Sequence, residues 1–284
     1  MINEHINIGE INTLKILRDT EPGLYLEATD EEVVLLPNAY VTDDMELDNE
    51  LDVFIYTDSE DRLVATTEQP LGYKDQFIST RVIDTVQYGA FVDFGLQKDL
   101  FVPKNRQKTP FKVGETRIVR VLVDEQTNRL VGVEKITSFL SKDTKELKTN
   151  DKVSLLIFAK TPLGYKVIVD NTYEGLIYQN EIFTKLSTGQ IVNGYIKSVR
   201  DDGKLDISLQ PIGKTNTLDA NSTKILNLLK SNDNTIPYNY KTDAQIVQDI
   251  FGMSKKAYKR TLTTLIESNR IKLDENGITL ITTK

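Results

Sequence analysis

Apolar and polar residues alternate in short runs through most of the chain, and the order of these runs recurs three times. In the middle copy, residues 88–94 precede Pro103, and the run 118–123 ends in a turn before a further run at 129–131. Matching runs occupy residues 23–26, 35–37, 53–56 and 62–64 in the first copy and 164–167, 175–178, 189–192 and 201–207 in the third. About five short runs of this period, separated by turn residues, predict a small barrel or sandwich in each copy.

The C-terminal segment changes to a helical period. A capping-box pattern at residues 242–245 and a capping serine, Ser254, predict the starts of two helices. An Asn-Gly pair at 276–277 lies between two alternating runs and predicts a hairpin. The expected buried helix faces contain Ile225, Leu226, Leu228 and Leu229, then Ile246, Val247, Ile250 and Phe251, then Tyr258, Leu262, Leu265 and Ile266. Helix, helix, tight turn, helix and β-hairpin is the order of a winged helix.

We therefore expect a multidomain, mainly β protein with three tandem five-stranded β-barrels followed by an α+β winged-helix domain. The expected domains are residues 1–69, 70–140, 141–213 and 214–284. Pro70 and Pro211 lie in the links, where proline should limit flexing. The alternative is one large all-β domain in which the similarity between copies arose by chance.

The composition argues against catalysis. The chain of 284 residues has no cysteine and one histidine, His5, so disulfides, thiolate metal sites and cysteine nucleophiles are excluded. No phosphate-binding loop, GxSxG motif or dinucleotide fingerprint is present. The acidic pairs 43–44 and 201–202 could hold Mg²⁺, but such pairs are more typical of turns. We expect a protein that is not an enzyme and that binds no metal and no cofactor.

The net charge of −7 is unevenly distributed along the chain. Residues 1–70 contain 3 Lys/Arg and 18 Asp/Glu, a net charge of −15. Residues 71–142, 143–217 and 218–284 carry net charges of +4, +1 and +3. Because the local field decides whether phosphate can approach, the three later parts can still bind a polyanion.

The sequence predicts a soluble, cytoplasmic protein with no membrane partner. No run approaches the roughly 18 apolar residues that cross a bilayer. The first residues also lack the basic and apolar regions of a signal peptide.

The middle copy resembles the OB-fold RNA-binding repeat of ribosomal protein S-one. Residues 88–95 and 99–103 carry the resemblance, although Leu100 stands where that repeat has glycine and Pro103 where it often has histidine. Three such repeats followed by a winged helix resemble the bacterial conserved virulence factor B (YitL-like) family. The resemblance implies OB-fold (S-one-like) barrels, RNA binding and post-transcriptional regulation of gene expression, including virulence factors.

In the middle copy, alternation places Ala90, Val92 and Phe94 inside and Phe91 outside, with Tyr88 at the loop end of the same strand. By resemblance, Tyr88 and Phe91 occupy positions on which RNA bases stack. The cations expected to flank them are Lys104, Arg106, Arg120 and Arg129. The alternative is that the two rings pack against a neighbouring barrel.

The third copy has Leu163 and Lys166 in place of these two aromatic residues, but Tyr178 can offer a ring at the position of the family's histidine. Its expected RNA-binding cations are Lys166, Lys197, Arg200 and Lys204, unless these form only a solvated face. The first copy, with its net charge of −15, is not expected to bind RNA.

In the winged helix, Lys256, Lys259 and Arg260 are expected on the exposed side of the third helix, where they could contact phosphate. Glu267 would oppose this contact, and side chains suited to reading bases are sparse.

The predicted partner is single-stranded RNA, with DNA second, and a monomer is favoured. The alternatives are a winged-helix DNA-binding transcription regulator, a non-catalytic protein-interaction scaffold and a metal-dependent nuclease.

Overall fold

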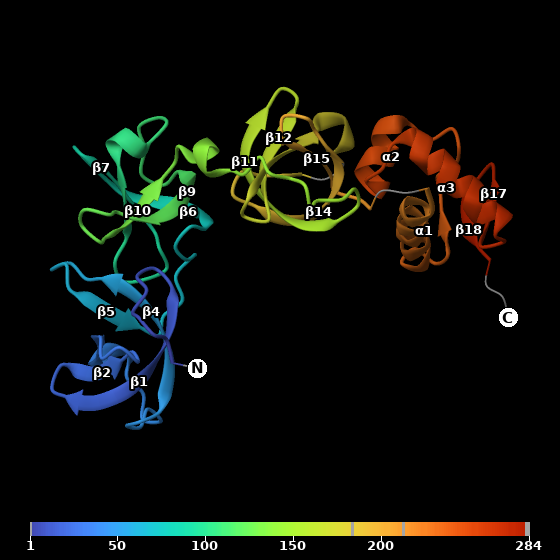
Figure 1. The fold of residues 1–284 in the computed structure, drawn as a ribbon. Coiled ribbons are helices and arrows are strands. Elements are labelled where there is room, and N and C mark those ends of the chain that lie inside the picture. Colours follow the sequence, from blue (N-terminus) through green and yellow to red (C-terminus); the bar gives the residue numbers. More distant parts are fainter. Residues whose placement is uncertain (1, 183–184, 212–213, 282–284) are drawn as a thin grey trace. The chain divides into compact units, whose positions relative to one another are not determined.

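The computed structural model describes residues 2–182, 185–211 and 214–281 (Figure 1). The chain divides into two compact units, Met1–Leu140 and Ser141–Lys284, each of which is described by itself. The first unit holds two closed five-stranded barrels, and the second holds a third barrel and a small sheet with helices. This mainly β architecture confirms the predicted fold class.

The three barrels have the same topology. In each, the third strand lies parallel to the fifth, and the other four neighbouring pairs are antiparallel. The strands of the first barrel are β1 (Ile11–Thr20), β2 (Gly23–Glu27), β3 (Val33–Pro37), β4 (Glu50–Thr57) and β5 (Leu63–Thr66). Those of the second are β6 (Phe77–Val86), β7 (Gly89–Val92), β8 (Leu100–Pro103), β9 (Thr116–Val123) and β10 (Leu130–Val133). Those of the third are β11 (Lys152–Thr161), β12 (Gly164–Val169), β13 (Tyr173–Tyr178), β14 (Ile191–Val199) and β15 (Leu205–Ser208).

A glycine opens the second strand of each barrel and sets its register. Gly23 pairs with Pro37, and Gly164 pairs with Tyr178. Their φ angles are +144° and +145°, and a Cβ would lie only 2.1 and 1.9 Å from the carbonyl oxygens of Leu36 and Ile177. Only glycine allows this conformation and this close approach, so the glycine fixes which side chains of the second strand face outward.

The first and second barrels share apolar contacts. The ring of Phe54 on β4 lies 6.1 Å from those of Tyr73 and Phe94. The Lys98 ammonium donates to the backbone carbonyls of Thr57 and Asp58, at 2.7 Å each. An apolar cluster that continues from one barrel into the other joins them into one body.

The C-terminal part is a winged helix, as predicted. Its helices are α1 (Lys214–Lys230), α2 (Ala244–Phe251) and α3 (Lys255–Glu267), and its sheet holds β16 (Thr235–Ile236), β17 (Ile271–Asp274) and β18 (Gly277–Leu280). The short strand β16, which pairs with β18, was not expected from the sequence.

Two local expectations in the winged helix were wrong. The cap of α2 is Asp243, which accepts from the Gln245 amide, whereas the Thr242 hydroxyl accepts from Asn239 in the preceding turn. On α2 only Val247 and Phe251 are buried, while Ile246 and Ile250 are 43% and 39% exposed. A helix of two turns presents too narrow a stripe to bury all four residues. Ser254 caps α3 as expected, accepting from the Ala257 amide.

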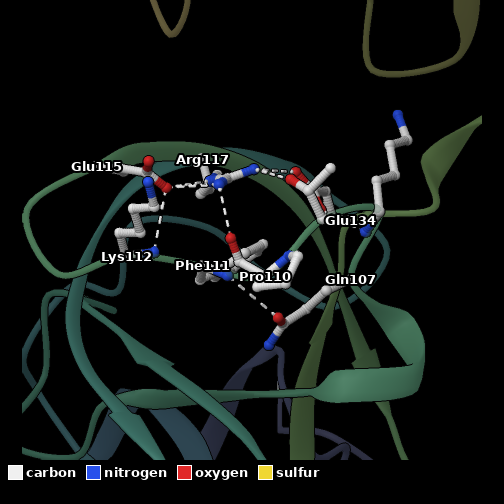
Figure 2. Close-up of polar contacts among 9 residues, drawn as sticks. Gln107, Pro110, Phe111, Lys112, Glu115, Arg117 and Glu134 are labelled. Atoms are coloured by element: carbon white, nitrogen blue, oxygen red, sulfur yellow. Dashed lines mark hydrogen bonds and ion pairs between the residues drawn. The ribbon is translucent and has the colours of Figure 1, made fainter.

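The loop between β8 and β9 is held by a network around Arg117 (Figure 2). Its guanidinium donates to Glu115 at 3.1 Å, Glu134 at 2.9 Å and the Pro110 carbonyl at 3.3 Å. It also lies 4.6 Å from the centre of the Phe111 ring. This network fixes the loop that begins with Lys104 and Arg106.

None of the helices in residues 2–182, 185–211 and 214–281 is long and apolar enough to span a membrane.

Replacing Arg117 by methionine should lower the free energy of unfolding by about 2–3 kcal/mol, because Glu134 is left buried without its cation. The Arg117 side chain is 18% exposed, which keeps the loss below that for a fully buried pair. Urea unfolding at neutral pH measures it. The matched control is Arg81→Met in the same barrel, where the described residues offer the exposed guanidinium no hydrogen bond or ion pair. Equal losses in the two variants would contradict the role of the network.

Candidate nucleic-acid interface

An aromatic platform forms the outer surface of β7 and β8. Phe91 lies directly opposite Phe101, with ring centres 5.2 Å apart, while Ala90 and Val92 are fully buried. Tyr88, in the turn before β7, is 74% exposed. The platform therefore presents flat apolar groups to solvent, which suits stacking of unpaired bases.

Two of the four expected cations lie on the loop next to this platform. The Lys104 amide donates to the Tyr88 carbonyl at 2.8 Å, which brings the backbone of Lys104 next to that of Tyr88. Its ammonium has no ion pair among the described residues. Arg106 is held by Asp124 at 3.1 Å. Lys104 is thus the cation best placed to meet a phosphate beside Tyr88.

Arg120 is not brought beside the platform. It pairs with Phe77 at the start of β6, whereas Phe91 pairs with Asp84 near the other end of that strand. Its guanidinium lies 5.2 Å from the Phe77 ring and 4.7 Å from the Phe139 ring. The sequence placed Arg120 on a later strand than the two rings but could not show which end of the barrel it reaches.

Arg129 pairs with the first barrel. Its guanidinium donates to Asp61 in the β4–β5 turn, and both side chains are about half exposed. This hydrogen bond holds the pKa of the Asp61 carboxyl below its ordinary value. A carboxylate of the acidic first barrel thus already pairs with Arg129, one of the predicted RNA-binding cations. The sequence could not predict this contact between domains.

In the third barrel, three predicted cations line one cleft of about 440 Å³. Lys166 comes from β12, and Arg200 and Lys204 come from the β14–β15 turn. Apolar lining comes from Leu163, Gly175 and Leu176, of which Leu163 is 66% exposed. We call this site the barrel-3 cleft.

Each cation of the barrel-3 cleft has a carboxylate partner. Lys166 donates to Glu174 at 2.9 Å, and the Lys204 ammonium lies 3.7 Å from Asp202. Arg200 donates to Asp206 at 2.8 Å. Partial burial acts to raise the pKa of Asp206, but hydrogen bonds from Arg200 and Ser198 outweigh it and the pKa lies below its ordinary value. The cleft is therefore close to electrically neutral while remaining rich in hydrogen-bond donors.

Tyr178 borders the cleft through Arg200. The guanidinium donates to the Tyr178 hydroxyl at 2.9 Å and lies 5.8 Å from the ring centre. The Lys197 ammonium, paired with Glu181, lies 5.9 Å from the same ring. All five predicted residues of this barrel therefore lie together. Lys166, Arg200 and Lys204 line the cleft, and Tyr178 contacts both Arg200 and Lys197.

The first barrel offers no open equivalent. Tyr25 occupies the register position of Phe91, opposite Leu35 on β3. The Arg18 guanidinium covers its ring at 4.5 Å. The ring face available in the second barrel is therefore already occupied here.

On α3, Lys256, Lys259 and Arg260 are exposed and have no ion pair among the described residues. The Thr263 hydroxyl is within 3.0 Å of the Tyr240 hydroxyl. Glu267 is exposed at the end of the helix, as expected. These three free cations are the strongest phosphate-binding candidates of the winged helix.

Sequence reasoning missed Phe101, Glu174 and Leu176. Phe101 was detectable, because the buried residues Leu100 and Val102 on either side place it on the outer face. Glu174 and Leu176 belong to the cleft only through the pairing of β12 with β13, which the sequence does not specify.

One group of potential metal ligands, His5, Asp30 and Glu32, lies at the surface of the first barrel. Its members already bond one another or the backbone. The His5 ring lies 2.5 Å from Asp30, which raises the pKa of His5, and Glu32 accepts from the Ile6 amide. These contacts hold the N-terminal segment against the first barrel.

The chain is similar to known proteins over nearly its whole length, and two domain models match parts of it. A model of the S1 domain matches residues 8–68, and a model of the CvfB-like winged helix domain matches residues 223–280. The chain is 31% identical to the uncharacterized protein YitL of Bacillus subtilis over 280 residues, covering 95% of this chain and 92% of that protein. It is 26% identical to conserved virulence factor B of Staphylococcus epidermidis, covering 96% and 94%. A solved multidomain protein with nucleic acid binding domains from Streptococcus pneumoniae is 22% identical, with coverage of 96% and 98% and a TM-score of 0.43.

Replacing Arg129 by glutamine should raise the pKa of Asp61 towards the ordinary value of about 3.9. Carboxyl-carbon NMR titration measures this shift. Because the folded-state pKa is depressed, the pair stabilises the fold above the unfolded pKa, and this contribution is lost as pH falls through the folded pKa. The stability difference between wild type and variant should therefore be present at neutral pH and vanish in acid. An unchanged titration of Asp61 would contradict the pairing.

Proposed function

Because the chain belongs to the conserved virulence factor B (YitL-like) family, we propose that it is a non-catalytic protein that binds single-stranded RNA and regulates gene expression after transcription. S1-type barrels and winged helices are nucleic-acid-binding domain types. The observation that carries the proposal is that barrels two and three each expose an apolar surface over their second and third strands, with cations beside it.

The surfaces of both barrels favour binding of unpaired bases over duplexes. Tyr88 and the Phe91–Phe101 pair offer ring faces, and the barrel-3 cleft offers an apolar floor. Bases in a duplex are stacked on each other and cannot reach such groups, whereas unpaired RNA can splay them outward. Lys104 and the cations of α3 supply phosphate contacts that need no particular sequence.

Several weak sites on one chain reinforce one another. Once one module holds the RNA, the next binds at a high effective concentration. The first barrel contributes least, because Arg18 covers its ring and its segment carries a net charge of −15.

The second candidate is duplex DNA binding through α3, and it rests on the three free cations of that helix. It predicts a preference for duplex DNA with sequence selectivity. A protein-interaction scaffold would bind neither nucleic acid at physiological salt. A nuclease would need a metal at residues 201–202, but Asp202 accepts from the Lys204 amide as a turn residue. Binding of single-stranded RNA, single-stranded DNA and duplex DNA across a salt series separates these alternatives.

Replacing Tyr88, Phe91 and Tyr178 together by alanine should weaken binding of single-stranded RNA by about 100-fold or more, because stacking contributes about 1–3 kcal/mol per base and three rings are removed. Fluorescence anisotropy with a labelled oligonucleotide measures the change. The control is Tyr25→Ala, which removes the covered ring at the matching position of the first barrel. Unchanged affinity in the triple variant would overturn the stacking role.

Replacing Lys256, Lys259 and Arg260 together by glutamine should reduce the salt dependence of RNA binding by about 2 units in the slope of log K against log [salt], since each phosphate contact contributes about 0.7. Titrations at several salt concentrations give this slope. Lys241→Gln, an exposed lysine outside α3, should leave the slope unchanged. If the triple variant keeps the wild-type slope, α3 does not contact phosphate.

A further inference from the structure

We propose that the barrel-3 cleft selects bases that carry an exocyclic carbonyl, such as uracil, over adenine. The inference rests on the proposed function and names the bases that this cleft prefers. It follows from which hydrogen-bonding groups of the cleft remain available once its internal ion pairs are counted.

The cations keep donors to spare. Lys166 uses one of its three N–H groups on Glu174. Arg200 uses Nε and Nη2 on Asp206 and Tyr178, and none of its hydrogen bonds within the described residues involves Nη1. The Lys204 ammonium lies 3.7 Å from its carboxylate, beyond ordinary hydrogen-bond length. Three side chains that each keep unused N–H groups therefore line one cleft.

The acceptors of the cleft are less accessible. The Glu174 side chain is 11% exposed, whereas its partner Lys166 is 42% exposed. The ammonium thus stands on the solvent side of the pair and screens the carboxylate from an incoming base. Asp206 is also mostly covered, at 18% exposed, and accepts from both Arg200 and Ser198.

A lining of this kind distinguishes bases by their edges. Uracil carries two exocyclic carbonyls, cytosine one, and guanine has O6 beside N7, so each offers an oxygen to a cationic donor. Adenine also has N7 as an acceptor, but it has an amino group where guanine has O6, and this donor would face ammonium and guanidinium groups that cannot accept, so adenine makes fewer favourable contacts with the cleft. The cleft volume of about 440 Å³ lies within the range of small-ligand sites, and its apolar floor can support one base.

The test measures affinity for oligouridylate and oligoadenylate of equal length, by anisotropy at one salt concentration. Self-stacking of oligoadenylate contributes equally for every protein variant, so the ratio of the two affinities is compared between variants. The wild type should prefer oligouridylate by about tenfold, the size expected for one charge-assisted hydrogen bond.

Replacing Lys166 by methionine removes the donor and uncovers Glu174, whose carboxylate can then accept from the adenine amino group. The ratio of oligouridylate to oligoadenylate affinity should fall well below the wild-type ratio. The double variant Lys166→Met/Glu174→Gln leaves no unpaired buried charge, so it guards against misfolding, and its ratio should lie between those of Lys166→Met and the wild type, because Arg200 and Lys204 still offer donors. The matched control is Lys145→Met, an 88% exposed lysine outside the cleft with its own carboxylate partner.

The outcomes separate the two proposals. If the wild type binds both oligonucleotides tightly and equally, the base preference is overturned and RNA binding stands. If folded Lys166→Met and the double variant keep the wild-type ratio, the preference does not come from this cleft and the inference fails. If the wild type binds neither oligonucleotide, the proposed function fails and the inference falls with it.

Discussion

The architecture depends on how closely the second strand of each barrel approaches the third. At Gly23 and Gly164 the backbone takes a conformation closed to other residues and passes a neighbouring carbonyl with no room for a Cβ. This contact fixes the strand register, and a shift of one residue would turn every outward side chain inward. The position of Lys166 on the outer face follows from it, and in the second barrel Gly89, where a Cβ would lie 2.4 Å from the Val102 carbonyl oxygen, has the same effect on Phe91.

The repeats and the winged helix could be predicted from the sequence, because both rest on local periods and turn residues. Burial of Ala90, Val92 and Phe94 followed from alternation alone. The site was only partly predictable. The contacts of Arg120 with Phe139 and of Arg129 with Asp61 join residues distant in sequence, and no local pattern specifies them. The two-turn helix α2 shows the same limit, because the helical period alone predicted burial of Ile246 and Ile250, and both are exposed.

The same barrel carries different surfaces on one framework. Arg18 over Tyr25, Phe91 beside Phe101, and Lys166 beside Leu176 occupy matching places in barrels one, two and three. The first is covered, the second is an open aromatic platform, and the third is a donor-rich cleft. Repetition thus preserves the backbone while substitution at a few outward positions changes the chemistry.

The bonding of Lys98 has a consequence for how the protein responds to ionic strength. Burial lowers the pKa of Lys98, and its ammonium bonds two carbonyl oxygens rather than an exposed carboxylate. Dissolved ions screen exposed charges far more than partly buried ones. A high-salt wash would therefore strip a bound polyanion from the surface while the first two barrels stay joined, so ligand release and barrel separation can be observed as distinct events.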